Sequence, residues 1–285
     1  MNQIFFFALE MKPYKLLSPS NQSNCVLFNS PHSGSTYTKK FTKLTDLSLQ
    51  TLRSSEDLFV DQLFSPVVDF GSFMLSATFP RAFIDLNRDN EELDPLLVND
   101  VTAYKDTLKV SAGLGVIPRV VADQTPIYNH RLSIDEANYR LQSFYFPYHE
   151  KLKTLIKKTW DSFKKVILLD CHSMPQSSIN LSKRKDPIDV VLGDCFGHSC
   201  EHEIVIELKY LLQEAGFRVS LNKPFSGGFI TRNYASPPNN IHVVQIEILR
   251  SLYSHEKKQT KNSEFLSIQN RLLGAIEQFI KRFEC

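Results

Sequence analysis

The stretch KVILLDCHSMP, which ends at Pro175, constrains the fold of this chain more than any other part of its sequence. It opens with the apolar run Val166–Leu169 and then turns polar. A short, continuous apolar run predicts a strand that is buried on both faces of a sheet. Side chains two residues apart share a face of a strand, so Asp170 and His172 are expected to point into one pocket. The structural alternative is a capped strand with a hydrogen-bonded histidine.

Further apolar runs alternate with amphipathic patterns along the chain. The expected strands cover residues 24–30, 71–78, 82–86, 113–119, 188–192, 217–221 and 241–249. The expected helices cover residues 44–52, 58–63, 134–160 with a break near Pro147, 200–215 and 262–283. This alternation, without a repeat or a low-complexity linker, predicts a single three-layer α/β/α domain with a mostly parallel or mixed central sheet. We expect that domain over residues 21–285, with residues 1–20 as an appendage.

The overall composition narrows the range of partners. The chain has 285 residues, of which 42% are hydrophobic, and its formal net charge is +2. That charge is too close to neutral to favour nucleic acid as a partner. The apolar run Ile4–Leu9 is too short to span a bilayer, so no membrane partner is expected. Five cysteines without a CxxC pair favour free thiols and a cytoplasmic location, whereas nothing in the sequence indicates the oligomeric state.

Candidate ligands occur at three further places in the sequence. His32 lies in a tight Pro-His-Ser-Gly turn after the expected strand 24–30. Glu56 and Asp57 lie at an expected helix start, where acids are favoured even without a function. Glu247 lies inside an apolar strand, where a carboxylate is costly unless it is paired or functional.

Together these residues suggest a metal centre. Two imidazoles and one carboxylate, with one open position, are the ligand set of catalytic zinc. His32, His172 and either Glu56 or Asp57 provide such a set. Zinc would activate a water molecule, and a separate carboxylate, Glu247, would move the protons. Three arginines are candidates for binding a carboxylate or a developing oxyanion, namely Arg81, Arg88 and Arg232. No HExxH motif is present to support a zincin-type protease.

The arginines at 81 and 88 flank a polar cluster. Arg81, Asp85 and Asn87 have the same parity, so on an extended chain they would face one pocket. Arg88 would join them if the strand has already ended. The alternative is a surface Arg–Asp cluster, which contributes little stability.

Several motifs make the chain resemble the N-formylglutamate amidohydrolase family, which is related to zinc carboxypeptidases and aspartoacylases. They occur in order between about residues 25 and 253. The motifs are Ser30–Gly34, Glu56–Asp61, Arg81 with Ile84–Arg88, Pro147–His149, Leu169–Ser173, Asp189–Gly193, Gly227–Gly228 with Thr231–Tyr234, and His242–Arg250. The resemblance implies a phosphorylase/hydrolase-like fold and a metal-dependent amidohydrolase that cleaves N-formyl-L-glutamate to formate and L-glutamate.

The resemblance also implies roles for individual residues. The metal, zinc or another divalent ion, would be held by His32, Asp57 and His172. Glu247 would act as general base and acid, and Arg81 would polarise the scissile carbonyl. The implied substrate-binding residues are Asn87, Arg88, Arg232 and Tyr234, which suit a small molecule with a carboxylate.

The sequence departs from the family pattern at two positions. Ser35 stands where the wider group has the glutamate of a His-x-x-Glu motif, so the acidic ligand must come from elsewhere. Asp57 is preferred for its place at the helix start, with Glu56 as the alternative. Ala235 stands where a glycine is usual, and residues 89–130, where acyl-group specificity would lie, match loosely. Other readings are therefore a different N-acyl amino acid, a C-terminal peptide bond, or a non-catalytic binder of acidic amino acids.

Overall fold

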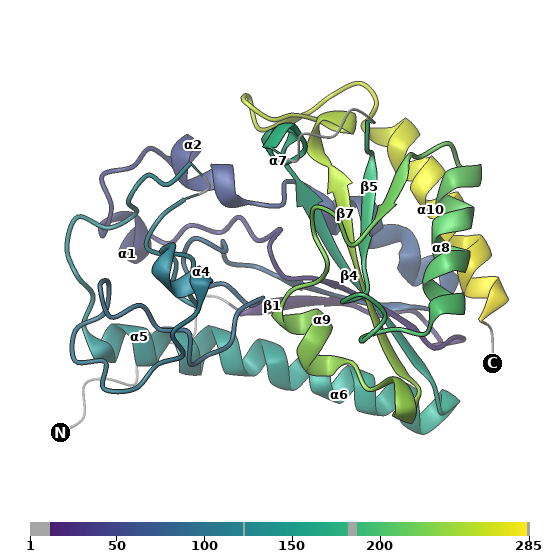
Figure 1. The fold of residues 1–285 in the computed structure, drawn as a ribbon, viewed down its shortest axis with the longest axis horizontal. Helices are drawn as coiled ribbons and strands as arrows, with labels where there is room; N and C mark the ends of the chain where they lie inside the picture. Colours follow the sequence, from purple (N-terminus) through teal and green to yellow (C-terminus); the bar gives the residue numbers. More distant parts are fainter. Residues whose placement is uncertain (1–11, 122, 182–186, 284–285) are drawn as a thin grey trace. The chain divides into compact units, whose positions relative to one another are not determined.

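The computed structural model describes residues 12–121, 123–181 and 187–283. Seven strands form a mixed sheet in the order β1-β3-β2-β4-β7-β5-β6, which confirms the α/β class (Figure 1). The strands are β1 (Tyr14–Leu17), β2 (Val26–Ser30), β3 (Phe73–Ala77), β4 (Val166–Met174), β5 (Val190–Gly193), β6 (Val219–Leu221) and β7 (Ile241–Leu249). A separate hairpin consists of β8 (Ser254–His255) and β9 (Thr260–Lys261).

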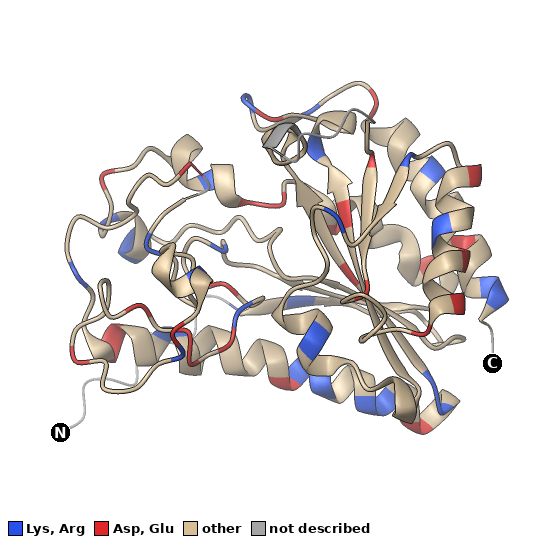
Figure 2. Cartoon of the chain, viewed as in Figure 1, with Lys and Arg blue, Asp and Glu red and all other residues tan. Residues whose placement is uncertain are grey.

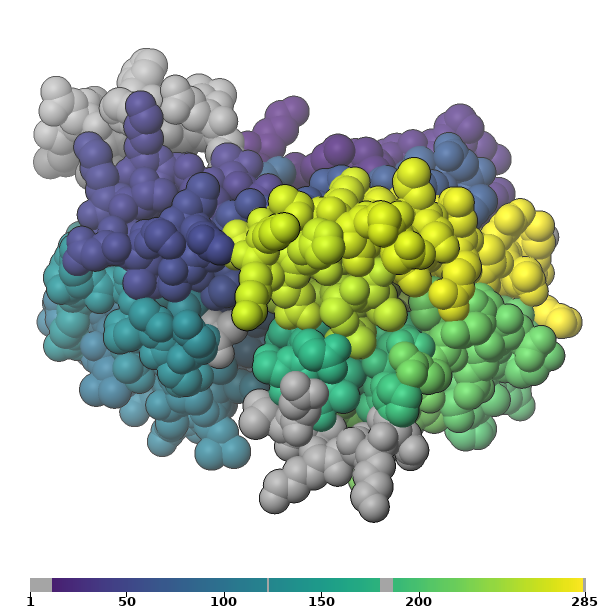
Figure 3. Space-filling view, turned by 90° about the horizontal axis from the view of Figure 1, so that it is seen from above, coloured from purple at the N-terminus to yellow at the C-terminus, as the bar shows by residue number. Residues whose placement is uncertain are grey.

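Helices flank this sheet. The α-helices are α1 (Lys39–Thr42), α2 (Leu49–Leu52), α3 (Val60–Phe64), α4 (Leu108–Ser111), α5 (Ile134–Arg140), α6 (Phe146–Phe163), α7 (Gln176–Leu181), α8 (His202–Glu214), α9 (Phe229–Tyr234) and α10 (Phe265–Arg282). Short 3₁₀ segments cover Arg53–Ser55, Ser65–Phe70, Pro237–Asn239 and Arg250–Leu252, and a π-helical segment covers Leu141–Tyr145. Figures 1 and 3 show α8 and α10 side by side. Charged residues of both signs lie along these two helices, as expected for amphipathic helices that cover a core (Figure 2).

The two central strands explain why apolar runs mark the middle of the sheet. Every residue of β4 is buried, and so is every residue of β7 after Ile241. β4 runs parallel to both β2 and β7, and central parallel strands of this kind are normally buried on both faces. β5 instead runs antiparallel to β7, which makes the sheet mixed. In the β4–β7 register, His172 lies beside Glu247.

The chain divides into two compact units. The first comprises Met1–Lys15, His32–Glu56 and Ser76–Leu152, and the second comprises Leu16–Pro31, Asp57–Leu75 and Lys153–Cys285. The second unit contains a core that joins buried residues of β2, β4 and β7 to those of α3, α8 and α10. The expectation of an appendage over residues 1–20 falls partly outside the described residues. Within that range, residues 14–17 form β1.

Two expected strands are absent from the described structure. Residues 82–86 and 113–119 form turns and irregular segments instead. In the first segment, Phe83 N–H donates to Pro80 O at 2.9 Å, which closes a turn. In the second, Gly113 has a positive φ of 74°, which a strand does not tolerate. The parity argument that placed Arg81, Asp85 and Asn87 on one strand face is therefore wrong.

The helix expected over residues 44–52 is also different. Within this range only α2 is helical, with four residues, and α1 ends before it at Thr42. Ser48 caps α2, because its hydroxyl accepts a hydrogen bond from Thr51 N–H. The long helical pattern from residue 134 changes to a π-helical segment that ends at Tyr145, close to the expected break near Pro147.

Candidate metal centre and active site

His172 is held between two buried carboxylates in the second unit. Its Nδ1 lies 2.9 Å from Asp57 Oδ2, and its Nε2 lies 3.0 Å from Asp170 Oδ2. Asp170 is itself fixed, because its Oδ1 accepts a hydrogen bond of 2.7 Å from Asn29 Nδ2 on the neighbouring strand β2. The two-residue spacing on β4 thus brings Asp170 and His172 together, as the sequence predicts.

These carboxylates control the charge of the imidazole. Burial alone would lower the pKa of His172, but Asp170, followed by Asp57 and Glu247, raises that pKa well above its usual range. Acidic residues are visible within the central strands in Figure 2. A cationic group is therefore strongly favoured at this point of the sheet, either a proton on the imidazole or a metal ion.

A second set of contacts orients Asp57. Arg250 Nη2 donates to Asp57 Oδ1 at 3.1 Å, and Ser173 Oγ donates to the same oxygen at 3.2 Å. Arg250 Nε also donates to Ser173 Oγ at 2.9 Å. All three side chains are buried. Asp57 Oδ1 is thus used for positioning, while Oδ2 faces the imidazole of His172.

Glu56 has different surroundings, in the first unit. Its Oε1 accepts a hydrogen bond of 2.7 Å from the Tyr37 hydroxyl, and Arg53 Nε lies 3.1 Å from its Oε2. Adjacent carboxylates therefore have separate partners, and of the two it is Asp57 that contacts a histidine of the candidate site.

Glu247 lies on β7 beside His172. Its Oε1 accepts a hydrogen bond of 2.9 Å from Gln245 Nε2, the neighbour on the same strand face. The Glu247 residue is 8% exposed, more than Asp170 at 0% or His172 at 2%. It is buried like these neighbours, which keeps its carboxylate beside the candidate site.

In the first unit, Asp85 is the centre of a charged cluster. Its Oδ1 lies 2.7 Å from His32 Nε2 and accepts a hydrogen bond of 2.8 Å from Asn87 N–H, and its Oδ2 lies 2.6 Å from Arg81 Nη2. Arg88 Nη2 is 4.0 Å from Oδ2. Burial would raise the pKa of Asp85, but Arg81, His32 and Arg88 bring that pKa well below its usual range.

Arg81, Asn87 and Arg88 thus converge with His32 through a turn rather than through a strand face. Arg88 is further fixed by hydrogen bonds of 2.8 Å from Nε to Leu114 O and from Nη1 to Asn87 O.

The remaining two predicted substrate-binding residues lie on α9 in the second unit. The Arg232 side chain is exposed, and its Nη1 donates to Gly227 O at 3.1 Å. Tyr234 lines a hollow of about 620 Å³ together with residues of α6. His149 is buried against the Tyr145 ring, with centroids 4.2 Å apart, in keeping with a structural role.

One group of side chains in the described part of the chain is suited to hold a metal ion. It consists of His32, Asp57 and His172, all buried, with one potential ligand atom of each within 4.8 Å of the others. Both histidines contact a buried aspartate through Nε2, which leaves Nδ1 as the ligand nitrogen. A carboxylate behind a metal-binding histidine is the usual supporting arrangement. The donor set therefore fits a divalent ion such as zinc.

Sequence reasoning missed the supporting role of Asp85, Asp170 and Arg250. The sequence pattern assigns Asp85 only to a pocket shared with Arg81 and Asn87, and it includes Arg250 only as part of a motif. The available signal was the position of Asp170, two residues before His172 in a buried strand, where an unpaired carboxylate would be costly.

A mixed α/β sheet with a buried His–Asp–His donor set and an adjacent glutamate defines the class: an α/β protein with a candidate metal centre. The model of the N-formylglutamate amidohydrolase family matches residues 24–254. The chain belongs to this family of amidohydrolases.

Similar proteins agree with this assignment. The chain is 29% identical over 236 residues to an N-formylglutamate deformylase of Pseudomonas putida, with 81% of this chain and 82% of that protein covered. It is 26% identical to an N-formylglutamate deformylase of Pseudomonas aeruginosa, with 81% and 83% covered. The crystal structure of N-formylglutamate amidohydrolase from Ralstonia eutropha JMP134 has a TM-score of 0.89 at 32% identity and covers 95% of this chain and 99% of that one. Among the described helices, none is long and apolar enough to cross a membrane.

Proposed function

We propose that this protein hydrolyses N-formyl-L-glutamate to formate and L-glutamate in a metal-dependent reaction. The observation that carries the proposal is the buried group of His32, Asp57 and His172 in a chain of the N-formylglutamate amidohydrolase family. The names of the two Pseudomonas relatives supply the substrate. The reaction adds water across the formamide: the C–N bond breaks, the formyl carbon gains oxygen, and the amine nitrogen gains a proton.

Within this proposal, His32, Asp57 and His172 hold a zinc ion or another divalent ion. When bound, such an ion polarises the formyl carbonyl and lowers the pKa of water. Asp85 and Asp170 keep the proton on Nε2 of the two histidines, so that each Nδ1 carries a lone pair. Arg250 and Ser173 keep Asp57 oriented toward the same point.

Glu247 accepts the proton of the attacking water and delivers it to the leaving nitrogen. Its location beside His172 on the neighbouring strand supports this assignment. Arg81 stabilises the negative charge that develops on the carbonyl oxygen. Arg88 and Asn87 bind the α-carboxylate, and Arg232 and Tyr234 are further substrate contacts.

A small molecule with a carboxylate is the proposed partner. The described cysteines, Cys25, Cys171, Cys195 and Cys200, form no disulfide with one another, which supports a reducing compartment, the cytoplasm.

The direct test measures release of L-glutamate, the product common to all three hydrolyses, from N-formyl-L-glutamate, N-acetyl-L-glutamate and a peptide with a C-terminal glutamate. We expect release from the first and little or no cleavage of the other two. In parallel, His172→Ala and His32→Ala should lose bound metal, because two protein ligands do not hold a catalytic zinc tightly. If the acetyl compound or the peptide is cleaved and N-formyl-L-glutamate is not, the proposed substrate is wrong. If the protein binds L-glutamate but cleaves none of the three compounds, it is a binding protein and not an enzyme for them.

A further inference from the structure

Arg140, the last residue of α5 in the first unit, is fully buried. Its Nε donates to Glu136 Oε1 at 2.9 Å, and Lys40 Nζ lies 2.7 Å from the other oxygen of that carboxylate. Burial would raise the pKa of Glu136, but Arg140 and Lys40 bring that pKa below its ordinary value. Even a paired guanidinium is costly to bury, and a hydrophobic side chain could often replace it without loss of stability. The contacts that only a guanidinium can make therefore indicate why an arginine is present.

Those contacts lead to the turn formed by residues 80–88. Arg140 Nη1 donates to Phe83 O at 2.9 Å and to the Tyr128 hydroxyl at 2.6 Å. The Tyr128 hydroxyl in turn donates to Ala82 O at 3.4 Å. Two consecutive carbonyl groups of the turn are therefore bound, one by Arg140 directly and one through Tyr128.

The ring of Phe83 is held by the same guanidinium. The Arg140 guanidinium carbon lies 4.3 Å from the centroid of this ring, a distance suited to a cation–π interaction. The Phe83 ring also packs edge-on against Phe41 and Phe144, with centroids 5.4 Å and 5.1 Å apart. An aliphatic residue at position 140 could fill the space, but it could not bind the carbonyl groups of the turn.

The position of Phe83 bears directly on the candidate site, because Asp85 follows two residues later. Asp85 N–H donates to Val116 O at 2.8 Å. The Asp85 carboxylate lies 2.7 Å from His32 Nε2 and 2.6 Å from Arg81 Nη2. A buried carboxylate can keep two such contacts only while its backbone stays in place, so the hold on Phe83 is transmitted to His32.

The other end of the turn is held from the same helical run. The Tyr145 hydroxyl donates to Arg88 O at 2.7 Å. Tyr145 belongs to the π-helical segment, after which Phe146 N–H donates to Leu141 O. Residues five apart do not share a face of an α-helix, whereas a π-helical turn closes between residues five apart. The π-helical segment thus allows Arg140 and Tyr145 to reach two points of one turn.

We propose that Arg140 and Tyr145 are positioning residues that fix this turn at both ends. Arg140 acts through Asp85 on His32, the proposed metal ligand. Tyr145 acts through Arg88 on the α-carboxylate of the substrate. This inference rests on the proposed function and adds two residues that touch neither the metal nor the substrate. Loss of one such hydrogen bond typically changes an equilibrium constant about threefold to tenfold.

The test measures zinc affinity by competition with a chelating indicator, and KM for N-formyl-L-glutamate. Arg140→Lys keeps the charge beside Glu136 but lacks the fork that binds several acceptors at once. It should therefore weaken zinc binding about threefold to tenfold. Tyr145→Phe should raise KM by a similar factor and leave zinc affinity unchanged.

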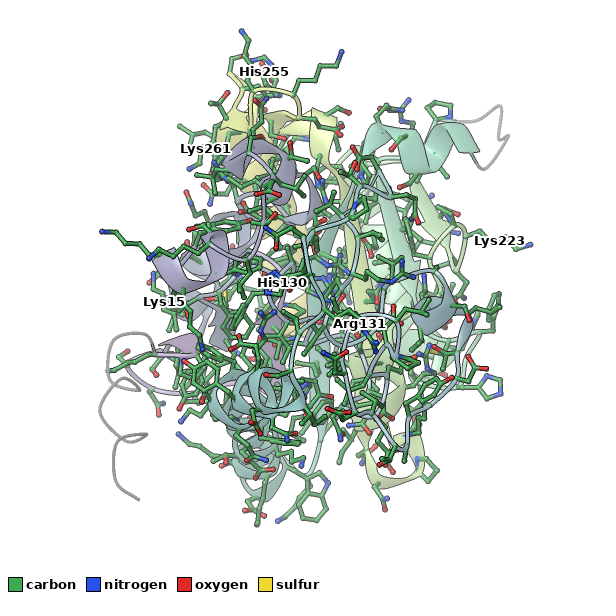
Figure 4. The ribbon with its side chains drawn as sticks, turned by 90° about the vertical axis from the view of Figure 1, so that its left-hand side faces the viewer. Lys15, His130, Arg131, Lys223, His255 and Lys261 are labelled. Carbon is green, nitrogen blue, oxygen red and sulfur yellow. The ribbon has the colours of Figure 1, made fainter. Side chains whose placement is uncertain are left out.

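Arg131, labelled in Figure 4, provides the matched control. It is an arginine of the same unit that also binds two backbone carbonyl groups, because its Nη2 donates to Pro95 O and Val98 O. Both carbonyl groups lie outside the 80–88 turn. Arg131→Lys should therefore change neither zinc affinity nor KM.

A double substitution separates positioning from a general loss of stability. If Arg140 acts through Asp85, Arg140→Lys should have no further effect on zinc affinity once Asp85→Asn is present. A general loosening of the fold would instead add to the effect of Asp85→Asn, and additive losses would overturn the proposal.

Amide hydrogen exchange of the metal-free protein separates the inference from the proposed function. Arg140→Lys should speed exchange at Phe83 and Asp85, whose N–H groups are hydrogen-bonded, and Arg131→Lys should speed it at residues 97–99 instead. These measurements need no turnover. If the wild type releases no formate while exchange and zinc affinity respond as expected, the reaction fails and the positioning role stands.

The proposal is overturned if folded Arg140→Lys keeps a zinc affinity within about twofold of wild type. An equal loss in Arg131→Lys or in Tyr145→Phe would also overturn it. If Arg140→Lys does not fold, Tyr128→Phe takes its place, because it removes only the hydroxyl between Arg140 and Ala82 O. Tyr128→Phe should weaken zinc binding in the same direction, and an unchanged affinity would refute the role of this contact.

Discussion

Asp170→Asn is the substitution that most sharply tests the hydrogen bonds behind the histidine ligands of the candidate metal centre. Asp170 is fully buried, with Oδ2 at 3.0 Å from His172 Nε2 and Oδ1 at 2.7 Å from Asn29 Nδ2. Asparagine has the same shape, so packing is preserved. The amide nitrogen of asparagine, however, is a hydrogen-bond donor. If it faced His172 Nε2–H, two donors would point at each other.

The imidazole has two ways to respond. It can move its proton to Nδ1, the nitrogen that faces Asp57 and is proposed to bind the metal, or the amides of residues 170 and 29 can both turn. In the second case the neutral amide oxygen of the introduced asparagine replaces the carboxylate of Asp170 beside His172 Nε2. The imidazole of His172 then becomes a weaker base. Changes of this kind behind a metal-binding histidine typically reduce metal affinity about 10- to 100-fold. At about 1.4 kcal/mol for each factor of ten, the expected loss is about 1.4–2.8 kcal/mol of binding free energy.

The assay is competition for zinc between the protein and a chelating indicator at fixed pH, with far-UV circular dichroism of the metal-free protein to verify folding. Asp194→Asn is the matched control, because Asp194 is another buried carboxylate of the second unit, and its hydrogen-bond partners are Asn222 and Gly197 rather than a histidine. A zinc affinity for folded Asp170→Asn within about twofold of wild type would refute the reasoning. Equal losses in both variants would refute it as well.

Three further predictions concern single side chains. Asp57→Ala should weaken zinc binding more than Glu56→Ala, as measured by the same competition, and the opposite order would move the acidic ligand to Glu56. Glu247→Gln should keep full zinc and its fold but lower kcat by at least about 100-fold, whereas near-normal turnover or lost metal would remove it as the proton-transfer group. The Asp189 carboxylate is paired with Arg218 at 2.5 Å; burial raises the pKa of Asp189, but Arg218 outweighs it and the net pKa is lowered. Stabilisation by this pair is therefore present above the unfolded-state pKa and is lost as pH falls through the folded one. Asp189→Asn should cost up to about 1 kcal/mol at pH 7 and progressively less toward pH 3, measured by urea unfolding, and a pH-independent cost would contradict the pairing.

The parts of the fold that could be predicted are those whose signal is local. β4 opens with a continuous apolar run and β7 is mostly apolar, and the burial of both strands is what makes these patterns recognisable. α8 and α10 likewise show their amphipathic spacing directly in the sequence.

The segment from Arg81 to Arg88 could not be predicted in the same way. Its turn is stabilised by the Asp85 side chain, which accepts from Asn87 N–H and contacts His32, about 50 residues away in the sequence. A local pattern contains no information about that contact. The apolar residues of the turn are buried by tertiary packing and therefore imitate a strand.

The residue types of the candidate centre were recoverable from sequence, whereas the division of labour among them was not. Whether Glu56 or Asp57 faces His172 depends on the backbone at a helix start, where Phe59 adopts a positive φ of 61°. Which imidazole nitrogen remains for a ligand depends on Asp85 and Asp170, partners whose distances only a structure supplies.

The most direct test of the central claim joins metal content to turnover in one preparation. The purified chain is analysed for metal, assayed for formate release from N-formyl-L-glutamate, stripped with a chelator, assayed again, and then titrated with zinc. The account predicts about one divalent ion per chain, loss of formate release on stripping, and recovery that saturates near one equivalent of zinc. Undiminished formate release by a chain shown to be free of metal would contradict it.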